Sequence, residues 1–237
     1  MLILFDIDAT LITTARCGIE AMGRAGRALF GESFDEGRVA YAGRLDPVIM
    51  RELLDVHGVA PTAETLDTFR REYRTHLNEL FSQGWYASAC PGVHALIDRL
   101  EREPTVTLGL LTGNYPETGS IKLRACGIEP DRFAIRVWAD DARGSPPART
   151  DLPPVGIARF RERHSRDPRS VVIIGDTPHD VACARAHRCR SLAVATGQFK
   201  LDELRAAGAD HAVPDLSGTE EIAAWLLNHD QASLPPS

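Results

Sequence analysis

Six short apolar runs, rich in branched residues, recur along the chain at the length of buried strands. They span residues 2–5, 106–112, 133–138, 170–175, 191–196 and 211–213. Near-continuous apolar runs of this kind are typical of strands that are covered on both faces, as in a parallel sheet. Segments with helical periodicity lie between most of these runs, at 92–103, 118–127, 153–165, 178–188 and 201–208. This alternation predicts an α/β fold with a doubly wound, Rossmann-like parallel sheet.

The region from residue 15 to residue 89 does not follow this alternation. Its apolar spacing indicates no buried strand and predicts three helices, at 18–31, 46–57 and 63–83. We therefore predict an all-α insertion, residues 15–89, within an α/β core that residues 1–14 and 90–228 form. The polar, proline-containing segment 229–237 is expected to be a flexible C-terminal tail.

Composition and charge exclude several classes of protein. The net charge of −6 provides no basic face for nucleic acid or for an anionic membrane. The N-terminus lacks a basic leader, and no apolar run has the length of a membrane-spanning helix. The five cysteines form no CxxC pair, so neither a disulfide framework nor a zinc site is expected. We expect a cytoplasmic protein, a monomer or homodimer, without a nucleic-acid or membrane partner.

Polar clusters follow three of the predicted strands, at the point where each strand ends. They are Asp6 and Asp8, Thr112 to Asn114, and Asp176 and Asp180. Because the carboxyl ends of parallel strands meet at one edge of a sheet, we expect these clusters to converge. The gathered carboxylates would repel one another strongly in a low dielectric, and a divalent cation relieves that repulsion. Oxygen ligands without cysteine or a histidine cluster favour Mg²⁺.

The order of these clusters resembles the haloacid dehalogenase (HAD) superfamily. The stretches "DIDATL", "LLTGN" and "GDTPHD" are similar to its motifs I, II and IV. The helical insertion resembles the C1 cap of its subfamily I, to which phosphoglycolate-phosphatase-like members belong, and the resemblance covers nearly the whole chain. It implies a Mg²⁺-dependent phosphatase that hydrolyses a small phosphorylated metabolite through an aspartyl-phosphate intermediate.

The resemblance also implies a role for each acid. Asp6 is the expected nucleophile, and Asp8 is the expected general acid and base. The implied metal ligands are Asp6, Asp176, Asp180 and, through its backbone carbonyl, Asp8. Since 2-haloacid dehalogenases lack an acid two residues after the nucleophile, Asp8 argues against that activity.

Further residues are implied to contact the substrate. Thr112, Gly113 and Asn114 are expected to bind the phosphoryl group that is transferred. Arg44, in a loop of the insertion, is either a substrate contact or a solvated arginine. Asp46 is predicted to be the N-cap of the helix that follows this loop.

The chain departs from the family pattern at two places. The family has glycine at the position of Ala9, so the turn there has either a negative φ or some backbone strain. The family also has a lysine or arginine ahead of motif IV. The region "SPPARTDLPP" holds no lysine, so we assign this catalytic role to Arg149, with Arg143 and Lys122 as substitutes.

Two other functions stay open at this stage. One is a phosphoryl transferase similar to β-phosphoglucomutase, which would share the fold and the motifs. The other is an inactive binding protein that kept the HAD fold, an alternative favoured by the missing lysine ahead of motif IV. The resemblance to phosphoglycolate-phosphatase-like members makes phosphoglycolate the first candidate substrate.

Overall fold

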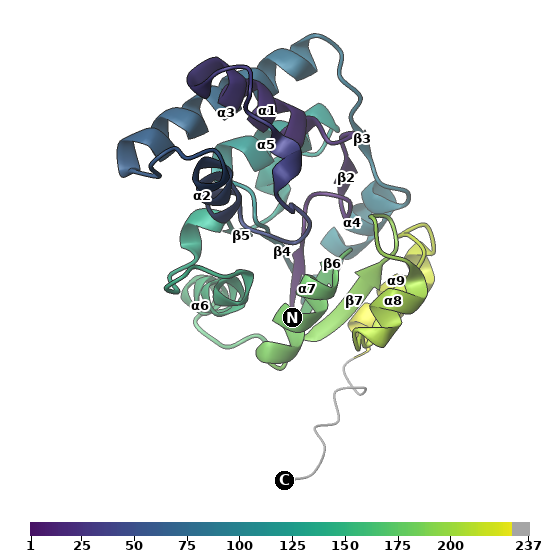
Figure 1. Ribbon diagram of the computed structural model, residues 1–237. Coiled ribbons are helices and arrows are strands. Elements are labelled where there is room, and N and C mark those ends of the chain that lie inside the picture. The colour runs from purple at the N-terminus through teal and green to yellow at the C-terminus, as the bar shows by residue number, and fades with distance from the viewer. Residues whose placement is uncertain (229–237) are drawn as a thin grey trace.

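The computed structural model describes residues 1–228, which form an open sheet of six parallel strands flanked by helices (Figure 1). The strands are β1 (Leu2–Phe5), β4 (Thr107–Leu111), β5 (Ile135–Val137), β6 (Val171–Gly175), β7 (Arg190–Val194) and β8 (His211–Val213). Their order, β5-β4-β1-β6-β7-β8, means that the chain winds outward from β1 in both directions. The predicted doubly wound parallel sheet is confirmed. The tail predicted at 229–237 lies outside the described residues.

Helices cover both faces of this sheet. They are α4 (Val93–Glu101), α5 (Pro116–Ala125), α6 (Leu152–His164), α7 (Pro178–Ala186), α8 (Leu201–Ala206) and α9 (Thr219–Leu227). Short 3₁₀ turns join some of the elements: η1 (Glu36–Arg38), η2 (Pro130–Arg132), η3 (Ala139–Asp141) and η4 (Arg149–Asp151). Within the described chain, no helix is both long and apolar enough to cross a membrane.

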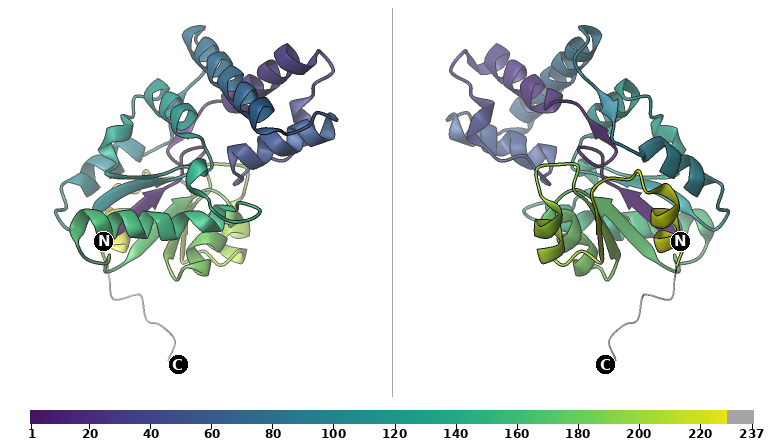
Figure 2. Two further views of the ribbon diagram at one scale, coloured as in Figure 1. Left: turned by 90° about the vertical axis from the view of Figure 1, so that its left-hand side faces the viewer. Right: turned by 90° about the vertical axis from the view of Figure 1, so that its right-hand side faces the viewer.

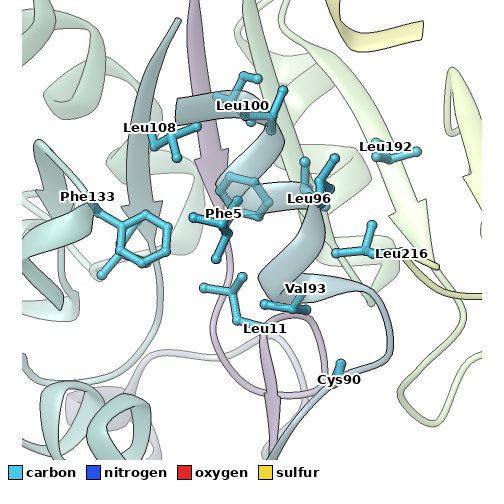
Figure 3. Packing of buried hydrophobic residues seen from close by; sticks show 14 of the residues in the cluster. Phe5, Leu11, Cys90, Val93, Leu96, Leu100, Leu108, Phe133, Leu192 and Leu216 are labelled. Carbon is cyan, nitrogen blue, oxygen red and sulfur yellow. The ribbon is translucent and has the colours of Figure 1, made fainter. Parts of the chain in front are cut away.

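The two faces of the sheet carry separate apolar clusters because side chains alternate along each strand. Ile3 and Phe5 of β1 pack into the cluster that also holds buried residues of α4 and α9. Figure 3 shows this cluster, in which Phe5 lies beside Leu96 of α4. Leu2 and Leu4 point to the opposite face and pack with residues of α6 and α7. Burial of β1 on both faces fixes the strand in place, and with it the position of the residues that follow it at the edge of the sheet.

A second group of helices lies at one end of the sheet (Figure 2). Its members are α1 (Cys17–Phe30), α2 (Asp46–Val56) and α3 (Ala63–Ser82), and we refer to these helices and their loops as the cap. The cap has its own apolar core. In it, the ring of Phe69 packs edge-on against the rings of Phe30 and Phe34, with distances between ring centroids of 5.7 and 5.6 Å. A small antiparallel ribbon joins the cap to the sheet; its strands are β2 (Ile12–Thr13) and β3 (Ser88–Ala89).

Buried polar contacts fasten the cap to the core. Asp46 is the first residue of α2, and its backbone N–H donates to the carbonyl of Gly113 at 2.7 Å. Its carboxylate accepts from the backbone N–H of Tyr115 at 3.1 Å, so the prediction that Asp46 caps its own helix was wrong. Arg70 of α3 donates two hydrogen bonds to Glu117 and lies 3.8 Å over the ring of Tyr115. These contacts set the cap against the start of α5.

Candidate active site

Asp6 and Asp8 follow directly after the central strand β1. A tight turn comes next, in which the backbone N–H of Leu11 donates to the carbonyl of Ile7 at 2.9 Å. Ala9 has a φ of +56° within this turn, which places it in the left-handed region. Of the two alternatives for this position, the structure therefore has backbone strain, which costs roughly 1–2 kcal/mol for a residue with a Cβ.

Three carboxylates meet at the carboxyl edge of the sheet. One oxygen from each of Asp6, Asp176 and Asp180 lies within 4.8 Å of the other two, and all three residues are buried. Burial raises the pKa of Asp6 to about 6 and the pKa of Asp176 to about 8, and the neighbouring acids add to both shifts. A buried set of oxygen donors whose charges repel one another fits a hard divalent cation.

Asp180 is held in place by the first turn of α7. Its Oδ2 accepts hydrogen bonds from the backbone N–H and the hydroxyl of Thr177, at 3.1 and 2.7 Å. The hydroxyl of Thr177 in turn accepts from the backbone N–H of Asp180, so the pair forms a capping box. A Cβ on Gly175 would lie 2.1 Å from the carboxyl carbon of Asp180, which explains why a glycine ends β6.

Arg149 is the cation beside this acidic cluster. Its Nη2 lies 2.9 Å from Oδ1 of Asp6 and 2.7 Å from Oδ1 of Asp180, and the guanidinium is buried. The two carboxylates raise the pKa of Arg149, so it stays charged despite burial. Arg143, by contrast, is exposed and donates to the backbone carbonyl of Asp140. Of the cations considered from sequence, Arg149 is the one that touches the predicted nucleophile.

Lys122 contacts a different acid. Its Nζ lies 3.1 and 2.9 Å from the two carboxylate oxygens of Asp8 and 2.7 Å from Oδ1 of Asn114. The side-chain amide of Asn114 also donates to Asp8 at 2.7 Å and to the hydroxyl of Thr112 at 2.9 Å. Sequence patterns indicated Lys122 only as a substitute for Arg149 and missed its contact with Asp8, because that contact joins segments far apart in the chain.

A cavity of about 800 Å³ opens between the cap and the core. Asp6 and Asp8 line its floor, and Tyr73 and Arg44 of the cap line it from above. The guanidinium of Arg44 forms an ion pair with Glu52 and donates to the carbonyl of Ala40 at 2.9 Å. Arg44 thus lies beside the cavity, as expected for a substrate contact, but its charge is already paired within the cap.

The cap loop lies so close to the core that a single methyl group is expected to displace it. Gly43 has a φ of +68°, and a Cβ there would lie 2.6 Å from the ring of His179. We predict that Gly43→Ala lowers kcat/KM about tenfold, because a small displacement of positioning groups is costly in catalysis. Steady-state hydrolysis of p-nitrophenyl phosphate, a substrate for the phosphatase activity that the family resemblance implies, measures the effect.

Gly58 provides a matched control for this substitution. It has the same φ of +68°, but nothing lies within 4 Å of a Cβ at that position. Gly58→Ala therefore introduces the same backbone strain in the cap without the clash. An equal loss of activity in both variants would mean that strain, and not the contact with the core, controls the effect.

Residues 3–194 match the haloacid dehalogenase-like hydrolase family, a span that contains all the acids and cations of the site described above. The chain belongs to this family. A crystal structure of a hydrolase from Pseudomonas syringae superposes on this HAD protein with a TM-score of 0.69 at 19% identity, over 96% of this chain and all of that one (100%).

Two relatives carry more specific names. The tyrosine-protein kinase PtkA of Mycobacterium tuberculosis is 30% identical over 205 residues, which are 85% of this HAD protein and 64% of the kinase. The chain thus spans less than two thirds of the length of that relative. The plasmid phosphoglycolate phosphatase of Cupriavidus necator is 27% identical over 215 residues, which are 90% of this chain and 89% of the phosphatase.

Proposed function

We propose that this HAD protein is a cytoplasmic, Mg²⁺-dependent phosphatase that hydrolyses a small phosphorylated metabolite through a phosphoryl group carried on Asp6. The observation that carries the proposal is the separation of two acids that stand two residues apart. Both acids line the cavity, but the side chain of Asp6 is only 7% exposed within the buried acidic cluster against Arg149, whereas that of Asp8 is 45% exposed. One acid is thus placed for attack and the other for proton transfer.

The proposed reaction has two chemical steps. In the first, an oxygen of Asp6 attacks phosphorus, the bond to the ester oxygen breaks, and Asp8 gives its proton to that oxygen. In the second, Asp8 takes a proton from water, the water oxygen attacks phosphorus, and the bond to Asp6 breaks. Inorganic phosphate leaves, and the carboxylate of Asp6 is restored. Thr112 and the backbone amides after it are the proposed donors to the phosphoryl oxygens.

The proposed metal ligands are the carboxylates of Asp6, Asp176 and Asp180, together with the backbone carbonyl of Asp8. Their support is the donor set itself, because three buried carboxylates with oxygens within 4.8 Å need a compensating charge beyond that of Arg149. When bound, Mg²⁺ supplies charge neutralisation for the phosphoryl oxygens. Arg149 keeps the nucleophile oriented, and Thr177 keeps Asp180 in place through its capping contacts.

Removal of the metal is expected to lower hydrolysis of p-nitrophenyl phosphate at least ~100-fold, and Mg²⁺ is expected to restore it. Mg²⁺ should also raise the melting temperature, since it binds the folded state. The carboxyl of Asp176 has a folded-state pKa of about 8, above its ordinary value, so without metal the folded state loses stability as pH rises toward 8. The Mg²⁺-induced rise in melting temperature should therefore be larger near pH 8 than near pH 6.

Asp176→Asn tests the metal site itself, because it removes one proposed ligand and keeps the shape of the side chain. It is expected to need more Mg²⁺ for the same activity and to reduce the Mg²⁺-induced rise in melting temperature. Full activity of the wild-type protein after chelation would contradict the proposed metal dependence.

A second candidate function is phosphoryl transfer to an acceptor other than water, which the 30% identity to PtkA favours. A screen of phosphorylated metabolites with Mg²⁺ separates the candidates by product. Free phosphate supports the phosphatase, an isomeric sugar phosphate supports a mutase, and phosphotyrosine formed with ATP supports a kinase. Binding without any turnover would support an inactive HAD-fold binding protein.

A further inference from the structure

Asp8 is held by two buried donors that do not touch the acidic cluster. The ammonium of Lys122 contacts both carboxylate oxygens of Asp8, at 3.1 and 2.9 Å, and the amide of Asn114 contacts one of them at 2.7 Å. The side chain of Lys122 is only 6% exposed, whereas that of Asp8 is 45% exposed, toward the cavity. The two donors thus bind the carboxylate of Asp8 on its buried side. Its exposed side faces the cavity and can contact a ligand.

Lysine is rare in this chain. Lys122 and Lys200 are the only lysines among its 27 Lys and Arg residues. An ammonium is a compact donor, while a guanidinium is a planar fork that needs more room. Room is scarce here, because a Cβ on Gly18 of the cap would lie 3.0 Å from Nζ of Lys122. The compact cation suits a position among Asp8, Asn114 and the cap helix α1.

Each acid of the pair after β1 therefore has its own buried cation. Arg149 contacts Asp6, and Lys122 contacts Asp8. A buried ion pair of this kind is weak evidence for added stability, because desolvation of both charges offsets much of their attraction. The geometry is better explained by orientation: Lys122 and Asn114 restrict the rotation of a half-exposed carboxylate that must reach a ligand atom.

We propose that Lys122 is a positioning residue that holds Asp8 where it delivers its proton to the leaving oxygen of the substrate. This inference rests on the proposed phosphatase function. It predicts a dependence on the leaving group that a purely structural lysine would not produce. p-Nitrophenolate is a weak base that departs without a proton, whereas phenolate is more basic and gains more from a positioned acid.

The test compares kcat/KM for p-nitrophenyl phosphate and phenyl phosphate in the wild type, Lys122→Met and Asp8→Asn. Lys122→Met is expected to lower kcat/KM for phenyl phosphate at least ~10-fold more than for p-nitrophenyl phosphate. Asp8→Asn should change the ratio of the two values in the same direction. Lys200→Met, the surface control, should leave both values unchanged. Circular dichroism verifies the fold of each variant.

Lys122→Arg covers the case in which Lys122→Met does not fold. It keeps the buried charge but cannot reproduce the compact contact with Asp8. We therefore expect the same change in the ratio of kcat/KM for phenyl phosphate to kcat/KM for p-nitrophenyl phosphate. An equal loss on both esters in the folded variant, or no loss on either, would overturn the positioning role while leaving the phosphatase assignment intact. A wild-type protein that hydrolyses neither ester would instead refute the proposed function itself.

Discussion

Asp6→Asn is expected to lower kcat at least ~10⁴-fold and to leave the fold intact. The amide cannot attack phosphorus, so the proposed phosphoryl intermediate cannot form. Burial raises the pKa of Asp6 to about 6, so near neutral pH and without metal the ionised carboxylate lowers the stability of the folded protein. Asparagine has the same shape and no charge, and the melting temperature in EDTA should therefore be unchanged or higher.

Hydrolysis of p-nitrophenyl phosphate and thermal unfolding in EDTA measure the two parts of this prediction. Asp141→Asn is the matched control: Asp141 accepts hydrogen bonds from Arg159 at 2.8 and 2.7 Å and lies outside the acidic cluster. That variant should keep its activity. Activity near the wild-type level in Asp6→Asn would remove Asp6 from the nucleophile role.

Arg149→Met is expected to damage both stability and catalysis. It removes the buried cation that contacts Asp6 at 2.9 Å and Asp180 at 2.7 Å, and leaves their charges uncompensated. Breaking such a pair costs about 3–5 kcal/mol of unfolding free energy. The loss should be smaller near pH 5.5 than near pH 8, because Arg149 lowers the pKa of Asp6 and its removal favours the protonated acid. We also expect kcat to fall at least ~100-fold.

Urea denaturation in EDTA at both pH values measures the stability change, and Mg²⁺-supported hydrolysis measures the catalytic one. Arg143→Met is the matched control, since Arg143 is an exposed arginine a few residues away whose side chain donates to the backbone carbonyl of Asp140. It should alter stability by less than about 0.5 kcal/mol. Comparable stability in the two variants would show that Arg149 is not the cation that compensates the cluster.

The sheet could be predicted from sequence because its signal is local. The apolar run at 2–5 and its five counterparts are short and rich in branched residues, and β1, β4 and β7 are buried on both faces, a pattern that few other elements produce. Helix α9 was not predicted, since every residue after Glu221 in its sequence, TEEIAAWLL, is apolar and the helix therefore shows no clear apolar stripe. The strands β2 and β3 are two residues long, which is too short for a periodic pattern.

The site was predictable to the extent that strand ends specify it. Asp6, Asp176 and Asp180 converge because parallel strands β1 and β6 are neighbours, a consequence of topology. The contact of Lys122 with Asp8, and that of Asp46 with the start of α5, depend on how the cap and α5 pack. Such contacts join residues remote in sequence, and no local pattern encodes them.

The most direct test of the central claim is to identify the residue that carries the phosphoryl group. The Asp8→Asn variant, in which the second step should be slow, is mixed with Mg²⁺ and p-nitrophenyl phosphate and then reduced with borohydride. An acyl phosphate on Asp6 is expected to appear as homoserine at position 6 in the tryptic peptide 1–16, only when substrate is present. Turnover with an unmodified Asp6, or with the phosphoryl group on another residue, would contradict the mechanism.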